Sequence, residues 1–430
     1  TRLFIPICLE TLFYMLSGMV DTLMLSAVGD YAVGAVGTAN SYIGIFIIMF
    51  SIISSGMVSV MTQNIGAGRP GVAYQARQLG LLFNAVAGVL MAVFLFSGAG
   101  AILRMVGIAD ALYEPALIYL KIVGGGCILN AVIPIFSSYL RAFGYTKQPL
   151  YATIVGNIAN FVMNAVFLFV LHKGVAGVAA ATVISKILNL CIVLYFSHKL
   201  ISAKNSTERI ANKTVLGQIV KVGLPSACET ALYNVAMMLV IRFLNQMDAE
   251  GLNVTARSYT ATISNFSYCV GAALAQANAI MTGWHIGAGE LEECDRGTKR
   301  AAFVGVCVAV CMETAIVLGS GFIMPLFTDN PEMTALVRKL LAIDIVLEIG
   351  RVTNLVFGQA LKTSGDAVFP AVIAAVFMFV FAVGGTWLFG ISMGLMAVGA
   401  YIGLASDECV RAVGMVWRWK TGKWRTKKLV

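Results

Sequence analysis

Charged residues are scarce in this 430-residue chain: Asp, Glu, Lys and Arg together make up 12% of it, whereas 59% is hydrophobic. Soluble domains carry roughly 25% charged residues, so the composition excludes an ordinary soluble enzyme or binding domain. Uncharged stretches, each longer than the roughly 20 residues that a transmembrane helix needs, cover residues 31–68, 78–103, 148–172, 258–289 and 367–406. We therefore expect an all-α integral membrane protein.

Residues that hold metals or form disulfides are also few. The chain has three histidines and nine cysteines, and the cysteines lie singly in apolar stretches. Cys307 and Cys311 have helical spacing, but no histidine or further cysteine accompanies them. We interpret the cysteines as small buried hydrophobic residues. We expect no cofactor, no enzymatic activity and no metal site beyond a possible Na⁺ site for a coupling ion.

Twelve transmembrane helices are predicted once the stretches interrupted by one or a few ionisable residues are included. They lie near residues 3–26, 35–63, 76–104, 115–141, 149–171, 175–200, 218–245, 256–284, 297–325, 334–361, 369–390 and 394–418. With both termini in the cytoplasm, most of the 30 Lys and Arg residues fall on the cytoplasmic side. This asymmetry orients membrane proteins, so the net charge of +9 indicates topology and an anionic inner leaflet, and no nucleic-acid partner. We expect a multi-pass protein of the cell membrane, the inner one where there are two.

Three sequence patterns occur twice. The pattern from Pro6 through Glu10 to Tyr14 returns at 225–233, Gly66-Ala-Gly68 returns at 287–289, and Leu140-Arg-Ala-Phe-Gly144 returns as 361–365. The second copies follow by 219 or 221 residues, which indicates a duplication of nearly the whole chain. We expect two homologous six-helix lobes, 1–200 and 218–418, joined by a cytoplasmic linker, 201–217, and followed by a basic tail, 419–430. Internal repeats of this kind are typical of secondary transporters.

Charges inside predicted spans are the informative residues, because each costs at least about 2.5–3.5 kcal/mol at mid-membrane and such residues usually line a cavity or an ion path. Two sets have a structural explanation, since their members are three or four residues apart and can pair along one helix. These sets are Glu348 with Arg351, and Asp407 with Glu408 and Arg411.

Asp21 has no basic residue within one helical turn. It ends a polar stripe on one helix face that comprises Glu10, Tyr14, Ser17 and Asp21. The seventh span repeats only the start of this stripe, as Glu229 and Tyr233. We consider Glu10, Tyr14, Ser17, Glu229 and Tyr233 candidates for substrate or coupling contacts.

Three neutral oxygen-bearing residues, Asn160, Asn164 and Thr182, are expected in the outer half of the first bundle, where they can meet Asp21. Na⁺ prefers oxygen ligands, and a proton requires a carboxylate, so the group could bind either ion. The alternative interpretation is that the amides and the hydroxyl only hydrogen-bond between helices.

In order along nearly the whole chain, these features resemble the multidrug and toxic compound extrusion (MATE) transporters of bacterial or archaeal type. The resemblance rests on Pro6 to Glu10, Val20-Asp21-Thr22, Gly66-Ala-Gly68, Gly174 to Thr182, Gly365-Asp366, Asp407 to Arg411 and Gly422-Lys-Trp424. It implies two lobes that alternate between inward-open and outward-open states, with a first-lobe cation site at Asp21, Asn160, Asn164 and Thr182. Several relatives carry an acid where this chain has Asn164, so the choice between H⁺ and Na⁺ stays open.

The resemblance implies a monomeric antiporter that exchanges H⁺ or Na⁺ for a drug-like, cationic amphipathic small molecule. Two alternatives remain. A flippase for lipid-linked oligosaccharides belongs to the same superfamily but needs a wide cationic cavity for a pyrophosphate. A membrane receptor or scaffold would give no reason for acids in the first helix of two matched lobes.

Overall fold

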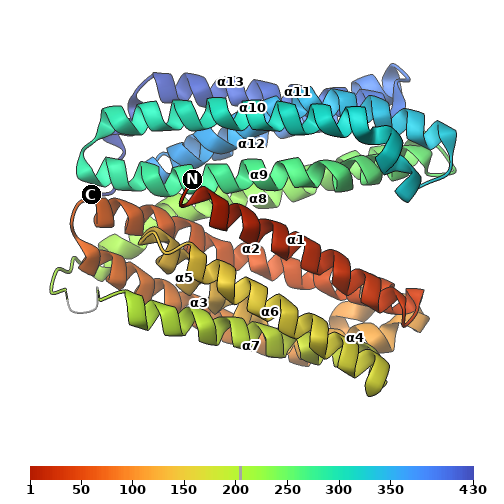
Figure 1. Ribbon diagram of the computed structural model, residues 1–430, viewed down its shortest axis with the longest axis horizontal. Helices are drawn as coiled ribbons and strands as arrows, with labels where there is room; N and C mark the ends of the chain where they lie inside the picture. Colours follow the sequence, from red (N-terminus) through yellow and green to blue (C-terminus); the bar gives the residue numbers. More distant parts are fainter. Residues whose placement is uncertain (203–205) are drawn as a thin grey trace. The chain divides into compact units, whose positions relative to one another are not determined.

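The computed structural model describes residues 1–202 and 206–430, and within these ranges every regular element is helical (Figure 1). In chain order the elements are α1 (Phe4–Ser26), α2 (Asp30–Gly66), α3 (Pro70–Val106), α4 (Asp110–Gly125), α5 (Cys127–Ala142), α6 (Lys147–Ala165), η1 (Val166–Val170), α7 (Gly174–Leu200), α8 (Asn212–Met247), α9 (Leu252–Ala288), α10 (Leu291–Ile323), η3 (Met324–Leu326), α11 (Pro331–Ser364), α12 (Val368–Phe377), η4 (Met378–Val383), η5 (Thr386–Ser392), α13 (Met396–Lys420) and η6 (Lys423–Thr426).

The chain forms two compact units, Thr1–Gly223 and Leu224–Val430. The helix α8 begins at Asn212, inside the segment 201–217 that we predicted as a linker. Residues 203–205 of that segment lie outside the described residues. Several helices extend beyond the predicted spans, because a helix can continue past the apolar layer into water, where charged residues are tolerated.

Twelve membrane crossings, six in each half of the chain, account for the described helices. The helices α4 and α5 form one crossing that bends by 42°, and α12 continues through η4 and η5 as another. Eight described helices, or nine crossings with the bent pair, are long and apolar enough to span a membrane by composition alone. The helices α9, α11 and α13 fall below that limit because they are more polar, and α11 and α13 carry the buried charges described below.

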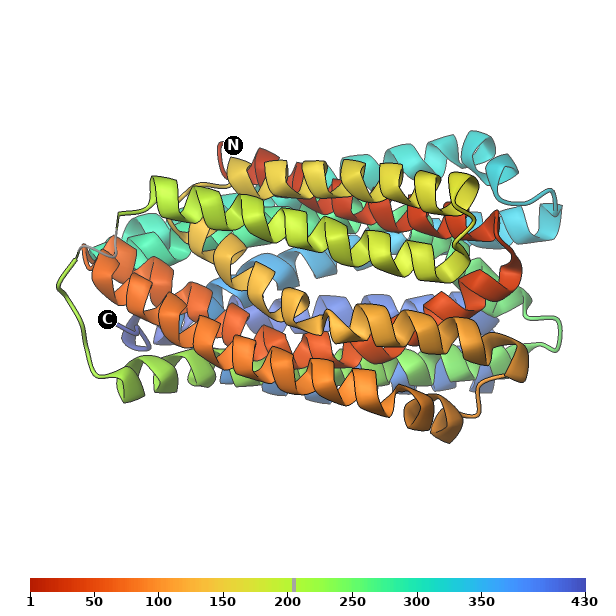
Figure 2. The same cartoon turned by 90° about the horizontal axis from the view of Figure 1, so that it is seen from below.

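Packing inside the first unit places the first helix against the fifth crossing. The helix α1 packs mainly against α6, and α6 runs alongside it in both views (Figures 1 and 2). A core of buried apolar side chains from α1, α2, α3, α4 and α7 lies beside this contact and includes Met24, Leu25 and Leu120. The contact between α1 and α6 positions the site in this unit.

The helix α13 approaches the η5 segment closely in the second unit. A Cβ atom on Gly399 would overlap the backbone of Phe389, and one on Gly403 would press on the backbone at Gly385. Only glycine allows this separation, as is common where membrane helices pack through small residues. The close contact fixes the position of α13 and of the charged residues on it.

Candidate functional site

Asp21 forms the centre of the site in the first unit. Its Oδ1 accepts two hydrogen bonds from α6, one from Asn160 Nδ2 at 2.8 Å and one from Asn164 Nδ2 at 2.9 Å. The two asparagines lie one helical turn apart, so their amides reach the same carboxylate. Both are buried, whereas Asp21 is half-buried. The structure therefore brings together three of the four predicted cation-site residues.

Two amide oxygens in this site lack a hydrogen-bond donor, and the Asp21 carboxylate lacks a positively charged partner. The Oδ1 atoms of Asn160 and Asn164 are buried without a hydrogen-bond donor in the part of the chain that the structure describes. No ion pair to Asp21 exists among the same residues. A buried polar atom without a partner is costly. A site that combines a carboxylate with two such oxygens suits a small cation.

Thr182, the fourth predicted residue, does not bond directly to Asp21. Its hydroxyl donates to the backbone oxygen of Val178 at 3.0 Å. Elsewhere in the first unit, the Tyr119 hydroxyl donates to Asn40 Oδ1 at 3.3 Å. We did not predict Tyr119 or Asn40 from the sequence, because neither stands in a motif.

The polar stripe on α1 divides into two environments. At its first end Glu10 forms an ion pair with Arg141, whose Nη2 lies 2.6 Å from Glu10 Oε1. Tyr14 is 75% exposed, and Ser17 is half-buried. Only Asp21, at the far end, meets the α6 amides. The candidate contacts of Glu10, Tyr14 and Ser17 with a substrate or a coupling ion stay predictions.

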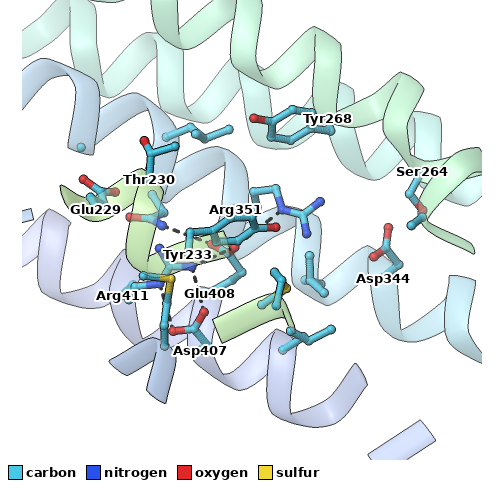
Figure 3. A pocket seen from close by; sticks show the side chains of 18 of the residues that line it. Glu229, Thr230, Tyr233, Ser264, Tyr268, Asp344, Arg351, Asp407, Glu408 and Arg411 are labelled. Atoms are coloured by element: carbon cyan, nitrogen blue, oxygen red, sulfur yellow. Dashed lines mark hydrogen bonds and ion pairs between the residues drawn. The ribbon is translucent and has the colours of Figure 1, made fainter. Parts of the chain in front are cut away.

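The second unit contains a cavity of about 470 Å³ (Figure 3). Its lining combines four acids and four bases with aromatic and polar side chains. The charged members are Glu229, Arg257, Asp344, Arg351, Lys362, Asp407, Glu408 and Arg411. Tyr233, Tyr268 and Tyr401 also line the cavity. The candidates Glu229 and Tyr233 therefore line the same cavity.

Ion pairs organise the charges beside this cavity. Arg411 contacts both oxygens of Asp407 through Nε and Nη2, at 2.9 and 2.8 Å, and Nη2 lies 3.0 Å from Glu408 Oε1. Arg351 pairs with Glu348 on its own helix and approaches Glu408 on α13 at 3.7 Å. The contacts within one helix join residues three or four positions apart, as the sequence predicts. The link from Arg351 to Glu408 joins two helices and could not be read from spacing.

Acids outnumber arginines around Arg351 and Arg411. Glu313 is fully buried, and among the described residues neither of its carboxylate oxygens has a hydrogen-bond partner. Asp344 is also buried, and its Oδ2 atom has no hydrogen-bond partner among the described residues. The predicted structural role of the paired residues stays a prediction.

Repeated six-helix units, apolar crossings and buried charged sites define this protein as a multi-pass membrane transporter. The chain belongs to the MatE family, whose model matches residues 6–166 and 225–388. It is 32% identical to the transporter YisQ of Bacillus subtilis over 98% of this chain and 94% of that protein. It is 20% identical to the probable multidrug resistance protein NorM of Thermotoga maritima, over 100% of this chain and 93% of that one.

A solved structure confirms the fold. The outward-facing structure of a multidrug resistance MATE family transporter of the MOP superfamily matches with a TM-score of 0.89 and 20% identity. The match covers 99% of this chain and 96% of the other. The predicted architecture of twelve transmembrane helices in two lobes is therefore confirmed.

Proposed function

We propose that this transporter is an antiporter that exports drug-like, cationic amphipathic compounds in exchange for H⁺ or Na⁺. The observation that carries the proposal is the Asp21 carboxylate, which accepts two amide hydrogen bonds and has no counter-ion among the described residues. A carboxylate in the apolar layer is costly unless a cation or a proton neutralises it. The coupling ion supplies that neutralisation.

Cation binding at Asp21 would alter the contact between α1 and α6. Hydrogen bonds to an ionised carboxylate are about twice as strong as bonds between neutral groups. When a cation neutralises Asp21, its bonds from Asn160 and Asn164 weaken, and the amides can turn their unpartnered oxygens toward the ion. Occupied and empty sites then favour different packing of α1, which is the differential affinity that alternating access requires.

The second unit supports an organic cation as the substrate. Its cavity combines three tyrosine side chains with four acids, and aromatic faces attract cations. Its equal numbers of acids and bases do not favour the pyrophosphate of a lipid-linked oligosaccharide. Export also fits the orientation that we infer from the basic residues, with both termini in the cytoplasm. We infer that the transporter acts as a monomer.

The test uses proteoliposomes with H⁺ and Na⁺ gradients imposed separately and a fluorescent organic cation as the substrate. We expect one of the gradients to drive accumulation by the wild-type protein. Asp21→Asn should fold but lose gradient-driven accumulation, because the amide cannot exchange a cation. Asp30→Asn is the matched control, since Asp30 is exposed at the start of α2, and it should transport normally. Accumulation at the wild-type rate by Asp21→Asn would refute the proposal.

A further inference from the structure

Two of the repeated sequence patterns meet in space as one ion pair in each unit. Glu10 and Arg141 belong to different patterns in the first half, and their side chains lie 2.6 Å apart. The equivalent residues in the second half, Glu229 and Lys362, also lie 2.6 Å apart. Each basic residue stands in the last turn of its helix, just before a glycine with positive φ. The duplication thus preserved an ion pair between the first and fourth crossings of each unit.

The basic partner differs between the two pairs. Arg141 presents a planar guanidinium, and Glu10 also approaches the Thr153 hydroxyl at 3.4 Å. Lys362 presents an ammonium group to Glu229 instead. Ammonium is a compact charge on a flexible stem and is strongly hydrated, whereas guanidinium is rigid and better suited to permanent ion pairs. The second pair is therefore the easier one to separate.

The pair of the second unit also faces the 470 Å³ cavity. The exposed fractions of the Glu229 and Lys362 side chains are 19% and 14%. With Lys362 in place, the four acids and four bases of the lining balance. If the ammonium leaves Glu229 for water, the lining lacks one positive charge, which a monovalent organic cation can supply.

We propose that Glu229 is a binding subsite for the cationic group of the substrate, and that Lys362 occupies it as a built-in cation until the substrate displaces it. The substrate class rests on the proposed function, but the subsite and its internal competitor do not. Thr230 and Tyr233 follow Glu229 on α8 and line the same cavity (Figure 3), so they can contact the body of the ligand.

Arg411 does not take over the place of Lys362. It lines the same cavity as Glu229, but its guanidinium is engaged by Asp407 and Glu408. If Arg411 moved away, these two buried acids would lose their positively charged partner, which is strongly unfavourable. A ligand cation therefore competes at Glu229 with the flexible lysine.

The experiment measures binding of tetraphenylphosphonium to the purified full chain by equilibrium dialysis, with no ion gradient. Lys362→Met removes the competitor and should tighten binding by about tenfold, a change equivalent to about 1.4 kcal/mol. Lys362→Arg keeps the charge, holds Glu229 more firmly and should weaken binding. Glu229→Gln should abolish most of it. Arg296→Lys, in the exposed pair with Glu293, is the control and should leave binding unchanged.

Unchanged binding in Lys362→Arg and Glu229→Gln would overturn the subsite, as would an absence of binding by the wild-type protein. Lys362→Arg retains a cation at the site, so it keeps the test decisive if Lys362→Met fails to fold. A failure of the proposed antiport would give a different result. Binding would respond to these variants as expected, but no ion gradient would drive transport. Conversely, gradient-driven transport with binding insensitive to both residues would leave the antiport intact and refute the subsite.

Discussion

Replacing Arg411 with methionine should strongly destabilise the second unit. Arg411 is 4% exposed and neutralises Asp407 and Glu408 at distances of 2.8 and 3.0 Å. Removing one partner of a buried ion pair costs about 3–5 kcal/mol, because the remaining charge is left uncompensated. For a unit of about 200 residues, each kcal/mol lowers Tm by about 2–4 °C, so we expect a decrease of roughly 10 °C.

The assay is thermal unfolding followed by size-exclusion chromatography of the detergent-solubilised protein. Arg296→Ala is the control, because Arg296 and Glu293 form an exposed pair, with side chains 75% and 55% exposed. Such pairs contribute about 0–1 kcal/mol, so its Tm should hardly change. Adding Asp407→Asn and Glu408→Gln to Arg411→Met should recover much of the loss. An unchanged Tm in Arg411→Met alone would show that Asp407 and Glu408 do not depend on Arg411 for their neutralisation.

Three further predictions concern topology, packing and the first-unit network. In a cysteine-free background, Lys428→Cys should react with an impermeant thiol reagent only from the cytoplasm and Lys173→Cys only from outside; the reverse pattern would overturn the orientation. Gly399→Val should lower Tm by several degrees, because its side chain would overlap the backbone of Phe389; normal stability would contradict the close contact. Asn160→Ala should weaken the cation dependence of transport, because the Asn160 amide donates to the Asp21 carboxylate; an unchanged dependence would exclude that role.

The twelve crossings could be predicted from the sequence because hydropathy is a local property of the chain. The same holds for the contact of Asn160 and Asn164 with one partner, since residues one turn apart share a helix face. Depth along the helices then placed Asp21 with them in the outer half of the first bundle. The duplication was also visible, although it did not show that Glu229 and Lys362 form a pair.

Other contacts between helices could not be predicted, because they depend on how each helix is rotated and packed. The Thr182 hydroxyl points to its own backbone, and Tyr119 comes from α4, which carries no recognisable motif. The approach of Arg351 to Glu408 similarly requires α11 and α13 to lie side by side. One sequence without its fold contains no signal for such pairs.

The proposed antiport requires that Asp21 exchanges a cation when substrate binds. The most direct measurement is release of the coupling ion from purified protein on addition of an organic cation, followed with ²²Na⁺ for sodium and with a pH dye in weak buffer for protons. We expect release of one of these ions from the wild-type protein and none from Asp21→Asn, although the variant still binds the substrate. Equal release from Asp21→Asn and the wild-type protein would contradict it.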